Sequence, residues 1–225
     1  MQLKLFITGT DTNVGKTYIS AGILSALNQL GWSTLGIKPV ASGCQLTDDK
    51  LCNADTLSHL QHSSIKLSHD EITPFAFEPA IAPHIAAQKA GCTLSVDEIN
   101  QKMRLAMETP ANVSVIEGCG GWHTPLNAQE TMADFVVTNQ LKVVLVVGMR
   151  LGCINHSLLT FRAMQQEGAN IVAWIANCID PNMENIDENI ATLKEWLPIP
   201  CLGVVAHGSE AEKAIDVKWM LELCK

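Results

Sequence analysis

The chain lacks the charge pattern of a nucleic-acid-binding protein. Only 17% of its 225 residues are charged, the formal net charge is −8, and no five or six like charges follow one another. Proteins that bind nucleic acid through its backbone present a basic stripe or patch, so we expect no nucleic-acid partner. An acidic chain can still bind a polyanion, but only at a local positive site.

Long hydrophobic runs are also absent. A membrane-spanning helix needs about 20 consecutive apolar residues, and no run of this chain approaches that length. The first residues, MQLKLFITG, contain one lysine and a short apolar stretch, without the small-residue cleavage site of a secretory leader. We therefore expect no membrane partner and no export.

No Cys-x-x-Cys pair occurs, which argues against a zinc site. The chain is 47% hydrophobic, and at this length it can form a core without disulfides. We expect most cysteines to be small buried side chains in a reducing compartment, which predicts a cytoplasmic protein. The eight cysteines are Cys44, Cys52, Cys92, Cys119, Cys153, Cys178, Cys201 and Cys224.

Internal repeats, low-complexity tracts and flexible linkers are missing too, so residues 1–225 are predicted to form a single domain. Short apolar runs alternate with longer amphipathic segments. Consecutive apolar residues indicate strands covered on both faces, and the alternation predicts an α/β fold with a mainly parallel sheet and helices on both faces. Strands are expected at 3–8, 34–39, 112–117, 142–148, 171–177 and 201–206. Helices are expected near 15–30, 54–61, 95–108, 130–140, 154–167, 185–196 and 210–223.

Residues 40–92 are the irregular part of this pattern. They include the polar segment VASGCQLTDDKLCNAD and the segment ITPFAFEPAIAPHIAAQKAG, which contains three prolines. Loops this long in a compact domain are usually functional. In an open parallel sheet such loops gather at the carboxyl ends of the strands, where ligands bind.

The segment GTDTNVGKT joins the first strand to the first helix. Gly9 and Gly15 enclose five residues, whereas the usual phosphate loop has four, so this is a variant with Thr10 at the first glycine position. Backbone N–H groups of such a loop, and the positive end of the following helix, bind phosphate. Lys16 would reach the β- and γ-phosphates, and Thr17 would ligate Mg²⁺. A turn that binds nothing would not need Gly-Lys-Thr here, and the segment predicts a P-loop NTPase-like fold.

Besides its Ser or Thr hydroxyl, a P-loop needs a second metal ligand, normally an acidic residue at the end of another strand. Glu117 directly follows an apolar strand and precedes Gly118, Gly120 and Gly121, glycines that permit close backbone approach to a ligand. The alternative for Glu117 is a loop cap. Asp55 stands at the start of a predicted helix. The sequence alone is equally consistent with two roles for it, an N-cap of that helix and a metal ligand.

Seven segments together resemble the dethiobiotin synthetase family, in family order and up to about residue 178. They are TGTDTNVGKT, GIKPVASG, NAD, PHI, VIEGCGGWHTPL, VVLVVGMRLGCINHSLLT and WIAN. The resemblance implies an ATP- and Mg²⁺-dependent ligase of biotin synthesis. Its substrate, 7,8-diaminopelargonic acid, forms a carbamate with CO₂, ATP phosphorylates the carbamate, and the second amine closes the ureido ring.

Residue roles follow from the same resemblance. Lys38, Lys16 and Thr12 would be catalytic, and Ser42 would contact the substrate. Taken alone, a strand-end lysine such as Lys38 would be a solvated side chain, but a fixed ammonium there can stabilise the carbamate and the charge of phosphoryl transfer. The implied metal ligands are Thr17, Asp55 and Glu117. The implied nucleotide contacts are Asn13, Val14, Gly15, Lys16, Thr17, Tyr18, Asp55, Glu117, Gly118, Cys119, Gly120 and Asn177.

The segment LGCINHS opens a helix, and free N–H groups at a helix start bind carboxylates. In the family it holds the substrate's distal carboxylate across a dimer interface. This implies a homodimer and makes Gly152, Cys153, Ile154 and Asn155 the candidates for binding the tail. The alternative is a turn capped by Asn155. Cys153 is expected to be buried and not nucleophilic, because phosphoryl transfer to a carbamate requires no thiol, and His156 to pack or cap.

Two departures from the family pattern concern the nucleotide. Asn13 stands where an acidic residue is frequent, and the segment VVAHGSEAEKA lacks a familiar Pro-aromatic pair. Asn177 could pair with the adenine edge or be a turn residue, and other base contacts, His207 included, stay open. Two other functions are less consistent with the sequence. A P-loop switch ATPase would carry a lysine at the position of Asp11, and an amidating ligase would need a glutaminase domain, for which this chain is too short.

Overall fold

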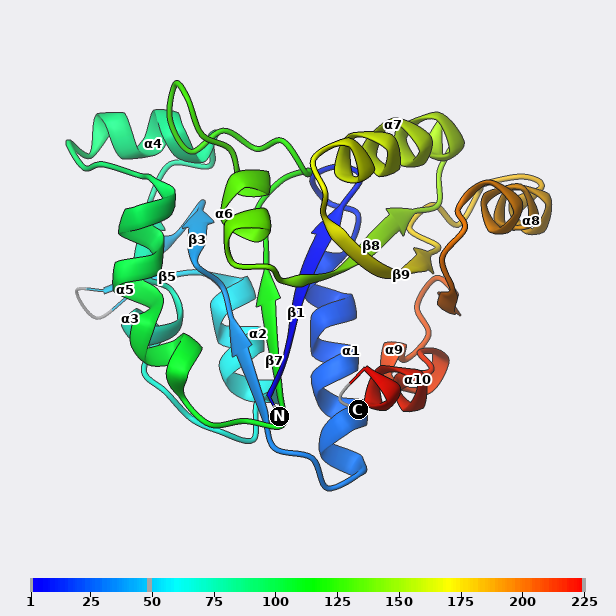
Figure 1. Cartoon of the computed structure of the whole chain (residues 1–225), viewed down its shortest axis with the longest axis horizontal. Coiled ribbons are helices and arrows are strands. Elements are labelled where there is room, and N and C mark those ends of the chain that lie inside the picture. Colours follow the sequence, from blue (N-terminus) through cyan, green and yellow to red (C-terminus); the bar gives the residue numbers. More distant parts are fainter. Residues whose placement is uncertain (1, 48–49, 224–225) are drawn as a thin grey trace.

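A six-stranded parallel sheet forms the centre of the computed structural model, which describes residues 2–47 and 50–223. The strand order is β10–β9–β8–β1–β7–β2 (Figure 1), and each neighbouring pair is parallel. The predicted strands and the α/β class are confirmed, with strand ends shifted by one or two residues at most. The strands are β1 (Leu3–Gly9), β2 (Thr34–Ile37), β7 (Val113–Glu117), β8 (Lys142–Gly148), β9 (Asn170–Asn177) and β10 (Cys201–Val205).

Two hydrophobic clusters lie on opposite faces of this sheet. In β8, Val143, Leu145 and Val147 belong to the larger cluster, whereas Val144 and Val146 belong to the smaller one. Successive side chains of a strand point to opposite faces, so a strand covered on both sides must be apolar throughout. This explains the sequence KVVLVVG.

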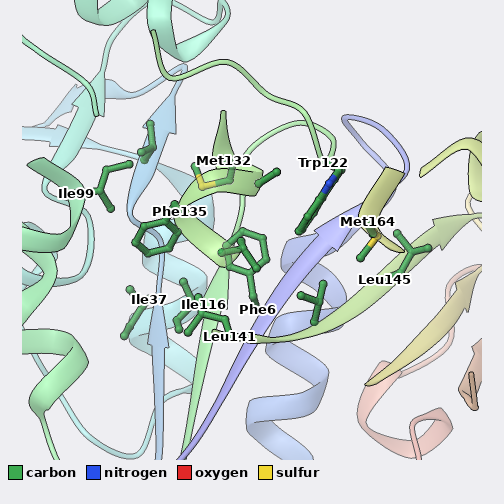
Figure 2. Close-up of a cluster of buried hydrophobic side chains, with 14 of the residues drawn as sticks. Phe6, Ile37, Ile99, Ile116, Trp122, Met132, Phe135, Leu141, Leu145 and Met164 are labelled. Atoms are coloured by element: carbon green, nitrogen blue, oxygen red, sulfur yellow. The ribbon is translucent and has the colours of Figure 1, made fainter. Parts of the chain in front are cut away.

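Helices cover both clusters, as predicted. The smaller cluster is covered by α1 (Lys16–Gln29), α9 (Ala211–Ala214) and α10 (Val217–Glu222). The larger is covered by α5 (Val96–Glu108), α6 (Met132–Thr138), α7 (Cys153–Gln166) and α8 (Ile186–Trp196). Figure 2 shows Ile99, Phe135 and Met164, which α5, α6 and α7 contribute to it. In the described part of the chain, no helix has the length and apolar character to cross a membrane.

The helix predicted over 210–223 is wrong as a single element. Between α9 and α10 the chain returns to the sheet, where Ile215 forms a bridge to Gly203 and the Asp216 N–H donates to the Leu202 carbonyl at 2.7 Å. The Asp216 carboxylate then accepts from the Lys218 N–H at 3.1 Å. Pairing with β10 therefore interrupts the helical pattern.

Residues 40–92 contain more regular structure than predicted. β3 (Val40–Ser42) pairs in parallel with β6 (Phe75–Phe77), and β4 (Gln45–Thr47) pairs antiparallel with β5 (Lys50–Cys52). Besides the predicted helix, α2 (Ala54–His62), this region forms α3 (His69–Ile72) and α4 (Pro83–Lys89). These elements place residues beside the carboxyl ends of β1 and β7.

Candidate active site

The loop between β1 and α1 is held in a shape that requires glycine. Gly15 precedes α1 with φ 88°, in the left-handed region, and a Cβ there would lie 2.1 Å from the Asn177 amide nitrogen. Asn13 also has a positive φ, 60°, and asparagine tolerates that region better than most residues. The loop therefore has the curled backbone expected of a phosphate-binding P-loop.

Lys16 is buried at the start of α1. Its ammonium donates to the Asp11 carbonyl at 2.9 Å and to the Gly120 carbonyl at 2.6 Å. Burial and the nearby Lys38 ammonium lower its pKa to about 8, although Glu117 acts in the opposite direction. Neutral carbonyl groups are weak partners for an ammonium, so an anion at this point would gain a charge-assisted bond.

Glu117 lies at the end of β7, opposite Ile7 of β1, and its carboxylate contacts three side chains that can donate a hydrogen bond. Its Oε1 accepts from the Thr17 hydroxyl at 2.8 Å and the Lys38 ammonium at 2.6 Å. Its Oε2 lies 2.8 Å from His59 Nε2. Burial alone would raise the pKa of Glu117, but the Lys38 and His59 partners outweigh burial and lower the pKa. Glu117 is thus a buried carboxylate, not a loop cap.

Asp55 does not cap the helix that it opens. Asn53 is the N-cap residue of α2, and its side chain accepts from the Asp55 N–H at 2.8 Å. The Asp55 carboxylate instead lies 3.0 Å from Lys38 Nζ. Burial favours a lower pKa for Lys38, but Glu117 and Asp55 outweigh it and raise that pKa. The Lys38 ammonium consequently lies between two carboxylates.

A cavity of about 1210 Å³ joins these groups. Ser42 lines it, and the buried Ser42 hydroxyl has no hydrogen-bond partner among the described residues. Thr12 lines it from the P-loop, and Trp122 and His123 line it from the segment after β7. Of the predicted site residues, those lining the cavity are Thr12, Asn13, Gly15, Lys16, Thr17, Lys38, Ser42, Asp55, Glu117, Cys119 and Gly120.

Several predicted nucleotide residues lie around the P-loop instead of lining this cavity. The Asn177 amide donates to the Val14 carbonyl at 2.9 Å, and the exposed Tyr18 hydroxyl bonds to the Ser209 carbonyl. Gly118 packs so closely on the Phe6 ring that a Cβ would lie 2.7 Å from it. The adenine role of Asn177 stays a prediction.

The predicted tail-binding segment also lies outside the cavity of its own chain. Gly152 is the N-cap of α7 with φ 92°, Cys153 is buried, Ile154 is partly buried, and Asn155 is exposed. Leu151, just before them, is 95% exposed. The segment therefore forms the first turn of α7 and does not line this cavity, whereas Leu159, Thr160 and Ala163, farther along the same helix, do line it.

Comparisons with known proteins identify the family. The family model described as an AAA domain matches residues 3–213. A protein named ATP-dependent dethiobiotin synthetase BioD from Pseudomonas aeruginosa (strain UCBPP-PA14) is 46% identical over 93% of this chain and 92% of its own. A protein of the same name from Cellvibrio japonicus is 47% identical over 92% of this chain and 90% of its own. Another from Pseudoalteromonas translucida is 42% identical over 97% of this chain and 96% of its own. The chain belongs to the dethiobiotin synthetase family.

Solved structures place the dethiobiotin synthetase family fold among P-loop proteins. The septum site-determining protein MinD from Pyrococcus horikoshii has a TM-score of 0.58 at 16% identity, with 99% of this chain and 90% of that one covered. Cobyrinic acid a,c-diamide synthase from Mycobacterium smegmatis has a TM-score of 0.56 at 14% identity, with 95% of this chain and 91% of that one covered. They share the fold alone, whereas the relatives at 42–47% identity are ATP-dependent dethiobiotin synthetases.

Sequence reasoning missed two contacts of this family member. One is His59, which lies on α2 four residues after Asp55; residues at that spacing share a helix face, which was the available signal. The other is Glu167, whose carboxylate accepts from Trp122 Nε1 at 2.6 Å and contacts His123 Nε2 at 2.5 Å. Glu167 is the C-cap residue of α7, so these contacts connect the segment after β7 to that helix. The residues are more than 40 positions apart, and no local sequence pattern predicts such a contact.

A third polar contact involves the P-loop itself. Asp11 forms an ion pair with Arg150, which follows β8. Partial burial favours a higher pKa for Asp11, but the Thr12 N–H and the Arg150 guanidinium outweigh it and lower that pKa. Asp11 stands at the position where a switch ATPase would carry a lysine. In this chain its ion pair with Arg150 connects the P-loop to the segment that leads into α7.

Proposed function

We propose that the chain uses Mg-ATP and CO₂ to close the ureido ring of dethiobiotin on 7,8-diaminopelargonic acid, with ADP and phosphate as the other products. One observation supports this most directly. Lys16 of the P-loop, Lys38 after β2 and Ser42 line one cavity of about 1210 Å³, and the Ser42 hydroxyl has no hydrogen-bond partner among the described residues. A phosphate-binding loop thus lies next to groups suited to an anionic carbamate.

The reaction divides into three balanced steps. One amine nitrogen attacks CO₂ and loses a proton, which gives a carbamate. A carbamate oxygen then attacks the γ-phosphorus, the bond to the bridging oxygen breaks, and ADP leaves. Finally the second amine attacks the carbonyl carbon of this mixed anhydride, loses a proton and expels phosphate, which closes the ring.

The lysines supply positive charge where these steps develop negative charge. Lys16 would exchange its carbonyl partners for β- and γ-phosphate oxygens, and Lys38 would stabilise the carbamate. Fixed cations in a water-poor site act strongly on the transition state of phosphoryl transfer. Thr12 and Ser42 offer hydroxyls that would orient the carbamate between the two lysines.

Mg²⁺ would be held by Thr17, Asp55 and Glu117. A hydroxyl and two carboxylates are the oxygen ligands that Mg²⁺ prefers, and the Lys38 ammonium, which pairs with both carboxylates, supports a place for positive charge beside them. When bound, the ion would neutralise charge on the phosphate oxygens. Within residues 2–47 and 50–223, no three His, Cys, Asp or Glu side chains could hold a metal together, so phosphates would complete its shell.

We further propose that a second copy of the chain supplies the tail site, in a homodimer. Gly152, Cys153, Ile154 and Asn155 form the first turn of α7, and none of the four lines the cavity of their own chain, which supports their action on a partner's substrate. Their N–H groups would bind the distal carboxylate. The adenine would lie on the other side of the P-loop, near Asn177 and Tyr18.

We propose that residues 1–225 form one ligase domain and act in the cytoplasm on small molecules, with neither nucleic acid nor a membrane as partner. The described cysteines Cys44, Cys52, Cys92, Cys119, Cys153, Cys178 and Cys201 are all free, which supports a reducing compartment.

Phosphate release tests the reaction. The enzyme should release phosphate from Mg-ATP only when diaminopelargonate and bicarbonate are both present, and mass spectrometry should find dethiobiotin in equal amount. A P-loop switch ATPase would release phosphate without either compound. Release that does not depend on them, or that occurs without ring closure, would disprove the proposal.

A further inference from the structure

His59 is buried directly behind the carboxylate that faces the phosphate site. Its side chain is 1% exposed, and its Nε2 lies 2.8 Å from Glu117 Oε2. Glu117 uses its other oxygen, Oε1, toward Thr17 and Lys38. The two oxygens of one carboxylate are therefore divided between a buried imidazole and the reactive cavity.

The contacts fix the direction of this hydrogen bond. Glu117 is held ionised by its neighbours, and an ionised carboxylate only accepts, so His59 Nε2 carries the proton and donates. His59 Nδ1 has no hydrogen-bond partner among the described residues. It faces Gly36, where an added Cβ would lie 2.5 Å from Nδ1. The glycine in β2 thus makes room for the ring.

The backbone of His59 is fixed as well. The Ser63 hydroxyl donates to the His59 carbonyl at 2.6 Å and accepts from the Gly36 N–H at 2.7 Å. This connection ties the end of α2 to β2. The imidazole is consequently held from two sides, by its own backbone and by the close approach of Gly36.

We propose that His59 is a positioning residue: its Nε2–H bond holds Glu117 so that Oε1 faces Thr17 and the divalent cation of Mg-ATP. This inference rests on the proposed Mg²⁺ site. Without the donor, the buried Oε2 would lose a hydrogen-bond partner, which is costly, and the carboxylate would turn to recover one. Partners behind a metal ligand typically contribute about 10- to 100-fold to metal affinity.

Cation binding to the ADP complex tests this role apart from turnover. Free Mn²⁺, measured by electron paramagnetic resonance during titration, gives the affinity. His59→Leu should weaken Mn²⁺ binding by about 10-fold or more and leave ATP binding in EDTA unchanged. His59→Gln, whose Nε2 is also a donor, should restore most of the affinity. The matched control is His62→Leu on the same helix, because His62 bonds to Ser58 and not to Glu117.

Specific results would overturn the inference. A folded His59→Leu enzyme with wild-type Mn²⁺ affinity would do so, as would a folded His59→Gln enzyme as weak as His59→Leu, because the ring would then act only by packing. If His59→Leu does not fold, Gly36→Ala tests the same point by displacing the ring. Unchanged Mn²⁺ affinity in folded Gly36→Ala would contradict the inference.

Nuclear magnetic resonance separates this inference from the proposed metal site. In the metal-free protein, the His59 Nε2–H proton should be protected from exchange and should shift in Glu117→Gln. An unprotected or unshifted proton would overturn the hydrogen bond itself. If wild-type enzyme with ADP bound no Mn²⁺ while this proton was protected, the proposed metal site would fail and the His59–Glu117 contact would stand.

Discussion

Two buried lysine ammonium groups lie near one another in a chain whose formal net charge is −8. Lys38 is neutralised by Asp55 and Glu117, and its pKa is raised. Among the described residues, the Lys16 ammonium donates only to carbonyl oxygens, and burial and the nearby Lys38 lower its pKa to about 8. A buried cation that bonds to no anion is costly, so an anion bound at Lys16 would be stabilised there. Lys16 is therefore the candidate for the local positive site that an acidic chain needs in order to bind a polyanion.

Lys16→Ala is expected to abolish turnover. The β- and γ-phosphates would lose their charged partner, and removal of one such group from a site of this kind costs about 10²–10³-fold in rate. Phosphate release with diaminopelargonate and bicarbonate measures the loss. Lys194→Ala, an exposed lysine of α8, is the control and should keep wild-type rates. Near-normal turnover of Lys16→Ala would refute the P-loop assignment.

Cys153 is expected to be inert even though it lies in the predicted tail-binding segment. Burial raises the pKa of its thiol, and the thiolate is the reactive form, so at neutral pH it should be alkylated more slowly than the exposed Cys92. Its rate should rise only as pH approaches the raised pKa. Iodoacetamide labelling followed by mass spectrometry measures both rates.

The matching variant is Cys153→Ala, which keeps the backbone N–H that would bind the carboxylate. It should retain most of the turnover. Loss of turnover in a folded Cys153→Ala protein, or labelling of Cys153 as fast as that of Cys92, would show that the thiol itself takes part in the reaction.

At the scale of elements, α2 carries two side chains to the site. Asp55 reaches Lys38, and His59 reaches Glu117. The start of α2 is fixed by Asn53, which accepts from the Asp55 N–H and donates from its amide to the Ser42 carbonyl at 3.2 Å. One cap therefore stabilises the helix and also aligns it with β3.

Asn53→Ala is expected to lower the free energy of unfolding by about 1 kcal/mol, the usual effect of losing an N-cap. Because α2 also positions Asp55, this variant should in addition require more Mg²⁺ for half-maximal turnover. Urea unfolding and a Mg²⁺ titration measure the two effects.

Ser95→Ala provides the matched control for Asn53→Ala. Ser95 caps α5 by accepting from the Glu98 N–H at 3.2 Å, and it does not line the cavity. It should show a similar loss of stability with an unchanged Mg²⁺ requirement. An equal shift of that requirement in both variants would mean that it reflects general destabilisation.

The elements that could be predicted are those with a strong local signal. The central strands are apolar on consecutive residues, and the P-loop has its own motif, so both were found. Four strands were missed, β3, β4, β5 and β6. Each has three residues, which is too short to show the alternation of apolar and polar residues that marks a strand. β3 also pairs with a segment more than 30 residues away. The break at Ile215 depends on β10, so no local pattern shows it. The spacing of His59 from Asp55 places both on one face of α2, but its partner Glu117 comes from β7 and cannot be found from the helix alone.

At the scale of the whole molecule, the parallel arrangement of the strands determines at which edge of the sheet the site lies. Each strand of the sheet is parallel to its neighbours, so all carboxyl ends lie at one edge. The P-loop after β1, Lys38 after β2 and Glu117 at the end of β7 share that edge, as ligand sites of open α/β sheets do. The tail segment 152–155 also follows a strand, β8, yet it does not line the cavity.

Complementation between two inactive variants tests whether a partner subunit supplies that segment. Lys16→Ala removes the P-loop cation, and Asn155→Asp places a negative charge where the substrate carboxylate is proposed to bind. Each variant alone should be nearly inactive. If every site combines the P-loop of one chain with residues 152–155 of its partner, a mixed two-fold dimer contains one intact site, and co-expression should restore about a quarter of wild-type sites. If both parts come from one chain, each chain of the mixed dimer is defective, and phosphate release should not exceed that of the separate variants.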